Sequence, residues 1–159
     1  MINIGAYMDL DGFDRSILRC LQQSTRFTSE QIAEKVGLSA TACQRRIKRL
    51  RDTGAIVREV AILSPDAVEN RLTLLVQIVV KRGRSDVIDA FKRDMMTYAE
   101  VQQCYYVTGA FDFILIVTAR DIVEYEHFTR RAFFDNPAIH EFNTTVVMEQ
   151  VKVGLEYPL

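Results

Sequence analysis

The chain has 159 residues, 48% of them hydrophobic, and a formal net charge of −1. This length allows one ordinary domain or two small ones with apolar cores. The longest apolar run is the strand-sized Phe113–Val117, far short of the roughly 20 residues that cross a bilayer, and the N-terminus lacks an export signal.

The small net charge hides an uneven distribution. Residues 1–64 hold 10 Lys and Arg against 7 Asp and Glu, whereas residues 65–159 hold 10 against 14. Within Arg45–Arg58 there are six basic residues and one acid, Asp52. A nonspecific polyanion binder is more often basic overall, so this local charge favours a reader of specific sequences.

The first predicted helix runs from Asp14 to about Gln23 and buries Ile17, Leu18 and Leu21. The acids before it resemble a calcium loop only faintly, because the glycine and the closing acid are out of place. We interpret them as helix-start residues, favoured by the positive end of the helix dipole.

Two further helices are predicted between Thr28 and Gly54. Thr28 and Gln31 form a capping box, and Gly37 stands where a helix ends in a left-handed residue. Ser39 can then cap a helix from Ala40 to Thr53. Two short helices joined by Gly-Leu-Ser, the second one basic, are typical of a helix-turn-helix that binds double-stranded DNA.

The last of these helices has two distinct sides. Cys43, Ile47 and Leu50 form its apolar stripe. Gln and Arg on the other side can reach base edges, and Lys and Arg can reach phosphates. The predicted DNA-binding residues are Ser39, Thr41, Gln44, Arg45, Lys48 and Arg49. An ordinary surface hairpin with a solvated basic face is the alternative.

The segment after Gly54 is predicted to separate two domains. Ala55–Leu63 is rich in Val and Ile and is expected to be extended, which would give residues 8–64 the form of a winged helix-turn-helix domain. Ser64-Pro65-Asp66 is typical of a turn, so the second domain is expected to span residues 65–159.

The second half alternates strands and helices in the order β-α-β-β-α-β. This order predicts a ferredoxin-like domain of the α+β class, an antiparallel sheet with two helices on one face. The expected strands and helices are Leu72–Lys81, Ser85 to about Met96, Val101–Thr108, Phe113–Ala119, Asp121 to about Phe134, and Ile139–Val153, with a turn at Gly109–Asp112.

The predicted sheet is apolar on one face and still partly apolar on the other, and the strand Phe113–Ala119 is apolar on both. Phe113, Leu115 and Val117 alternate with Ile114 and Ile116, whereas a sheet with one wet face should alternate apolar with polar residues. Because the helices cover one face only, we expect the other to pack on a second copy of the chain. The DNA-binding half or the N-terminal tail could cover it instead.

Four segments together resemble the Lrp/AsnC family of transcriptional regulators over nearly the whole chain. They are LDGFDRSIL, VGLSATACQRRIKRLRDTGAI, VTGAFDF and TTVVMEQVK. The resemblance implies a DNA-binding domain joined to an oligomerising domain that binds a small effector, often an amino acid. It also implies homodimers that can assemble into octamers, and activation or repression of transcription.

The Gly109–Asp112 hairpin is the predicted effector site. Gly109 can adopt a positive φ that leaves backbone N–H groups free for a carboxylate, and Asp112 can accept a bond from an ammonium group. Ala110 replaces an acid that is frequent in the family. The resemblance adds Tyr106, Thr108, Thr145, Val146 and Val147 as pocket residues. Alternatively, Asp112 only bonds backbone in the turn.

An enzyme is the main alternative from another class, since ferredoxin-like domains also host catalysis. His127 and His140 are expected at the surface, and no phosphate loop, nucleophile elbow or metal-ligand spacing occurs. No cofactor, metal or membrane partner is therefore expected. The three separated cysteines fit reduced, core-packed thiols of a cytoplasmic protein. An architectural DNA-binding protein without an effector is the remaining alternative.

Overall fold

The computed structural model describes residues 8–69, 72–81 and 85–159. Their contacts divide into two units, one of residues up to Ile62 together with Val153–Leu159, the other of Leu63–Lys152. Among the described residues, no helix has the length and hydropathy needed to span a bilayer.

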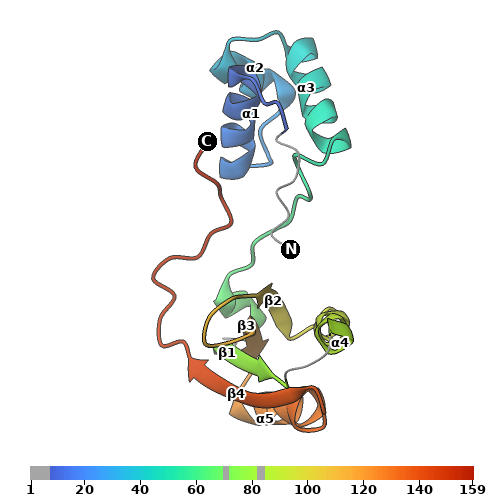
Figure 1. Cartoon of the computed structure of the whole chain (residues 1–159). Helices are drawn as coiled ribbons and strands as arrows, with labels where there is room; N and C mark the ends of the chain where they lie inside the picture. The colour runs from blue at the N-terminus through green and yellow to red at the C-terminus, as the bar shows by residue number, and fades with distance from the viewer. Residues whose placement is uncertain (1–7, 70–71, 82–84) are drawn as a thin grey trace. The chain divides into compact units, whose positions relative to one another are not determined.

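The helical unit contains α1 (Gly12–Gln23), α2 (Ser29–Val36) and α3 (Ala40–Asp52) (Figure 1). Each helix begins at the side-chain cap that the sequence supplies, namely Asp11, Thr28 and Ser39. Gly37 ends α2 with φ +74°, a conformation that only glycine adopts cheaply. The predicted helix-turn-helix is confirmed, and the first helix starts at Gly12 rather than Asp14 because Asp11 is its cap.

The three helices enclose a core of seven buried residues, Ile17, Leu18, Ile32, Ala33, Cys43, Ile47 and Leu50. The expected wing is not formed in the described residues, since the segment after Ile56 contains no strand. Val57, Val60 and Ile62 are exposed there. An extended segment becomes a strand only when a neighbour satisfies its N–H and C=O groups, and no strand of the described residues pairs with it.

The tail Val153–Leu159 belongs to the helical unit, although it lies in the expected second domain. The side-chain amide of Gln22 donates to the Tyr157 carbonyl at 3.0 Å and accepts from the Tyr157 N–H at 2.7 Å. Arg19 Nε donates to the Leu159 carbonyl at 2.6 Å, and Leu159 packs against the helical core. These contacts attach the tail to α1.

The second unit contains β1 (Leu72–Val80), α4 (Ser85–Met95), β2 (Val101–Tyr106), β3 (Phe113–Ala119), α5 (Ile122–Thr129), the π-helix η2 (Arg130–Phe134) and β4 (Ile139–Val146), after a short 3-10 helix (Pro65–Val68). The sheet order is β2-β3-β1-β4 and all pairs are antiparallel. This is the predicted βαββαβ arrangement, in which α4 and α5 share one core with the sheet.

Three predicted strand ends were wrong: β1 ends at Val80 rather than Lys81, and β2 ends at Tyr106 rather than Thr108. The last strand ends at Val146 rather than Val153, because β1 begins at Leu72 and the Val147 N–H bonded to the Thr73 carbonyl is the last rung of the ladder. The last helix changes at Arg130 from α to π geometry. Cys104 is exposed, contrary to the expectation that all three cysteines pack in cores.

Candidate nucleic-acid interface and effector site

The exposed side of α3 carries the predicted DNA-binding residues. Cys43, Ile47 and Leu50 are buried, which fixes the rotation of the helix and turns Gln44, Arg45 and Lys48 outward with Thr41 and Arg49. The Ser39 hydroxyl accepts a hydrogen bond from the Ala42 N–H at 3.3 Å and thereby caps the helix. Among the described residues, neither Arg45 nor Lys48 has an ion-pair partner, so both can meet phosphates or bases.

Arg49 is not free in the same way, because it pairs with Asp14 of α1. Asp14 also accepts from Arg46 Nη1 at 2.8 Å, and Asp11 accepts from the same atom at 2.7 Å. Sequence reasoning missed this cluster. The signal was present as two acids one turn apart on α1 and two arginines one turn apart on α3, but it is informative only once the helices are known to be adjacent.

The cluster keeps both carboxylates ionised. For Asp14, burial raises the pKa, but hydrogen bonds from Arg49, Arg46 and the Asp11 backbone bring it below the ordinary value. For Asp11, the Asp14 N–H and Arg46 lower the pKa. The side chain of Asp14 is only 1% exposed, so its charge is balanced almost entirely by the two arginines.

The Gly109–Asp112 hairpin has the backbone geometry predicted for Gly109, with φ +132°. Asp112 is bound into the sheet: its N–H donates to the Ile78 carbonyl and its carbonyl accepts from the Val107 N–H, both at 2.9 Å. Its Oδ2 accepts from the Val80 N–H at 2.8 Å. The carboxylate therefore already has a structural partner, and Ala110 is exposed.

The other predicted effector residues fall into two separate groups. Tyr106 ends β2, with its ring 5.0 Å from that of Phe113 and the Lys92 ammonium 4.6 Å from its centroid. Thr108 is exposed in the hairpin beyond it. Thr145, Val146 and Val147 lie at the end of β4, on the opposite edge of the sheet.

The two groups also lie at different ends of the strands. The hairpin is bonded to Ile78 and Val80 near the end of β1, whereas Thr145 pairs with Leu75 and Val147 with Thr73 near its beginning. A single chain therefore does not bring the two groups into one pocket.

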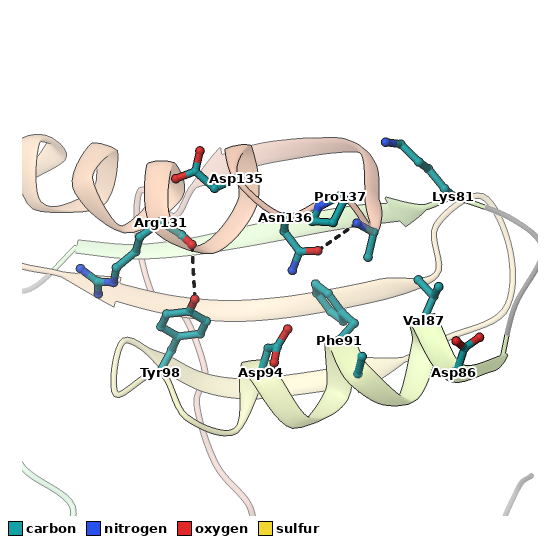
Figure 2. A pocket seen from close by; sticks show the side chains of 12 residues that line it. Lys81, Asp86, Val87, Phe91, Asp94, Tyr98, Arg131, Asp135, Asn136 and Pro137 are labelled. Carbon is teal, nitrogen blue, oxygen red and sulfur yellow. Dashed lines mark hydrogen bonds between the residues drawn. The ribbon is translucent and has the colours of Figure 1, made fainter.

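A cavity of about 770 Å³ that sequence reasoning missed lies between α4 and η2 (Figure 2). Asp94 of α4 and Asn136, which follows η2, lie on opposite sides of it. Asn136 Oδ1 accepts from the Ala138 N–H at 3.0 Å, and Arg131 is paired with Glu100. None of the predicted effector residues lines it. Its elements are distant in sequence, so no local motif marked it.

Within the described residues, no three His, Cys, Asp or Glu side chains are placed to hold a metal ion. His127 and His140 are exposed, as expected from the sequence.

Comparisons with known proteins cover both units. Residues 10–51 match the AsnC-type helix-turn-helix domain and residues 73–156 match the Lrp/AsnC ligand binding domain. A relative in Sinorhizobium fredii, the uncharacterized HTH-type transcriptional regulator y4tD, is 50% identical over 96% of this chain and 90% of its own. The leucine-responsive regulatory protein of Escherichia coli K12 is 35% identical over 91% of this chain and 88% of its own.

Solved structures of transcriptional regulators also match the fold of this chain. An AsnC family transcriptional regulator from Agrobacterium tumefaciens has a TM-score of 0.88 at 34% identity and covers 94% of this chain and 97% of its own. The transcriptional regulator NMB0573 from Neisseria meningitidis, solved as a complex with L-Met, has a TM-score of 0.87 at 28% identity over 94% and 96%.

Proposed function

Because the chain belongs to the Lrp/AsnC family of DNA-binding transcriptional regulators, we propose that it binds specific duplex sequences through α3 and responds to an amino acid. The protein then acts on chromosomal DNA in the cytoplasm. The family is one of transcriptional regulators rather than of enzymes.

The observation that carries the DNA-binding proposal is the outward face of α3. Gln44 has the side-chain geometry to bond adenine with both amide atoms, and Arg45 to bond guanine. Lys48 supplies a point charge for phosphate. Since Ile47 and Leu50 are locked in the core, this face is presented by a rigid helix.

A homodimer formed through the open face of the sheet fits the burial pattern. On β1, alternate residues are fully buried beneath the helices, while Leu75 and Val79 are only partly covered within the chain. On the same face, Ile116 of β3 pairs with Leu75, and Ile114 pairs with Gln77, which lies between Leu75 and Val79. These four partly covered apolar side chains on one sheet face favour a second copy as their cover, and such dimers can assemble further into octamers.

The effector site proposed at the hairpin needs such a partner. The related NMB0573 regulator was solved with L-Met, which supports an amino acid as the chemical class. The Gly109–Asp112 hairpin offers backbone N–H groups and a carboxylate, but Thr145, Val146 and Val147 lie at the other edge of the same sheet. A second subunit can supply them, so ligand binding and assembly would be coupled.

Selection of binding sites from a random duplex library, followed by footprinting, tests the DNA-binding proposal. A regulator should protect one or a few discrete sites, whereas uniform coverage would indicate an architectural protein. Replacing Gln44, Arg45, Lys48 and Arg49 together by Ala should abolish protection, while Arg93→Ala on α4 should leave it unchanged. Normal protection by the quadruple variant would refute the assignment.

A further inference from the structure

Two acids at the start of α1, which we call the acidic pair, hold two arginines of the DNA-reading helix. The acidic pair is Asp11 and Asp14. Oδ1 of Asp14 accepts from Arg46 at 2.8 Å, and its Oδ2 accepts from Arg49 and from the Asp11 N–H. Asp11 accepts from Arg46 at 2.7 Å and from the Asp14 N–H at 2.8 Å. Each of the four carboxylate oxygens of the pair thus accepts at least one hydrogen bond.

The acidic pair divides the cations of α3 into two classes. Arg45 and Lys48 have no ion-pair partner in the described part of the chain, whereas Arg46 is bonded to both acids and its side chain is only 25% exposed. Arg49 is half exposed and is bonded by one nitrogen, so it is shared between Asp14 and solvent. Arg51, the fifth cation of α3, pairs with Glu59 at 3.0 Å, so the acidic pair holds two of the five cations and Arg45 and Lys48 stay unpaired among the described residues.

That division matters because attraction to the phosphate backbone is independent of sequence. Each phosphate that a cation neutralises steepens the salt dependence of binding by about one unit on a log–log scale. A reading helix with every cation free would bind any duplex strongly and would gain little from correct bases. Withholding cations lowers binding to all sequences, while the base contacts of Gln44 and Arg45 stay available.

We infer that Asp14, assisted by Asp11, is a specificity-determining residue: it keeps Arg46, and in part Arg49, from the phosphates and so limits binding to unrelated DNA. The inference rests on the proposed reading role of α3. Asp14 touches no base or phosphate itself and acts as a positioning residue through the two arginines.

The test compares Asp14→Asn with the wild-type full-length protein on a selected site and on an unrelated duplex, over a salt series. With Arg49 released, binding to the unrelated duplex should tighten roughly tenfold at low salt, and the salt slope should steepen by about one. The ratio between the two affinities should shrink. A protein that was merely less folded would instead bind both duplexes more weakly with an unchanged slope.

Asp11→Asn is a second variant that does not endanger the fold, because Asn is as good a helix cap as Asp. It should act in the same direction with a smaller change. Asp9→Asn is the matched control, since it removes the same charge two residues earlier and Asp9 is exposed without an ion pair among the described residues. It should leave the specificity ratio close to that of the wild type.

A third variant removes the charge of Arg46, the arginine that both acids hold. Arg46→Met in the wild-type background should leave the salt slope unchanged, because Arg46 does not reach phosphate while the acidic pair holds it. A slope that becomes shallower by about one would overturn the inference, as would folded Asp14→Asn protein with wild-type binding to unrelated DNA. A wild-type protein that prefers no duplex would instead refute the proposed function.

Discussion

The carboxylate of Asp112 accepts a hydrogen bond from the Val80 N–H at 2.8 Å, beyond the point where β3 can pair with β1. The register of the two strands ends at the pair Ile78 and Phe113, two residues before Val80. A side-chain oxygen therefore satisfies a donor that a longer strand would have bonded. Asp112 is a structural residue of the sheet, whether or not it also meets a ligand.

The hairpin prediction consequently needs a variant that separates the two roles. Asp112→Asn keeps an oxygen acceptor for the Val80 N–H and removes the negative charge. If the charge binds an α-ammonium group, ligand affinity should fall by about 1.5–3 kcal/mol, the range for a hydrogen bond to a charged group. Calorimetry should use the amino acid that most raises the melting temperature in a screen of all twenty.

Asp112→Ala serves as the structural comparison. It leaves the Val80 N–H without its partner and should lower the free energy of unfolding by about 1–3 kcal/mol even without ligand. Unchanged ligand affinity in Asp112→Asn would place the effector site elsewhere.

The reading helix gives a second prediction, in which two kinds of contact respond differently. Lys48→Ala should weaken binding to all duplexes alike and make the salt slope shallower by about one, because one phosphate contact is lost. Gln44→Ala should relax preference at one base step, at a cost of about 1–3 kcal/mol there, with the slope preserved. Binding titrations on a panel of singly substituted sites measure both, and identical profiles for the two variants would contradict the distinction.

A third prediction concerns the sheet face that the helices leave open. Leu75 lies between Ile116 and Thr145 on that face, so Leu75→Asp places a charge at the centre of the proposed dimer interface. It should cost several kcal/mol of dimer stability and yield a monomer in sedimentation velocity. Met96→Asp is the control, since Met96 is 86% exposed at the end of α4. A dimer that survives Leu75→Asp at micromolar concentration would exclude this interface.

These cases show what the sequence could predict. Helix starts were predictable because caps are local: Thr28 bonds Gln31, and Ser39 bonds Ala42, each three residues away. The role of Asp112 depended on how far β1 extends past β3, and the acidic pair depended on the packing of α1 against α3. The tail was the least predictable, because its contacts join residues 135 and 140 positions apart.

A fourth prediction concerns the pH dependence of the stability of the fold. The folded-state pKa of Asp14 is below its ordinary value of 3.8, so the unfolded chain takes up this proton first as the pH falls. The contribution of ionised Asp14 to the free energy of unfolding is thus complete above about pH 4. It is lost as the pH falls through the lower, folded-state pKa.

The wild type should exceed Asp14→Asn in stability by about 1–3 kcal/mol near neutral pH, from the lost charge-assisted bonds. The gap should narrow below about pH 4. Native-state hydrogen exchange of core amides in α2 and α3 measures it, and a gap that stays constant to pH 3 would assign the difference to packing instead.

The fifth prediction tests the attachment of the tail. Gln22→Ala removes both bonds to Tyr157 and should expose the tail, residues 153–159, to limited proteolysis, with cleavage roughly tenfold faster for a loss of about 1.4 kcal/mol. Gln23→Ala is the matched control, because Gln23 is exposed and makes no side-chain hydrogen bond among the described residues. Equal cleavage rates in the two variants would show that the tail is held by other contacts.

The position of the tail also sets an order of events during synthesis. The three helices leave the ribosome early, but the strip of α1 that bonds Tyr157 and Leu159 stays uncovered until those residues follow, 135 and 140 positions later. At about 5–20 residues per second this interval is on the order of ten seconds. The helical unit thus acquires its last contacts only after Leu63–Lys152, which lie between its helices and its tail, have been translated.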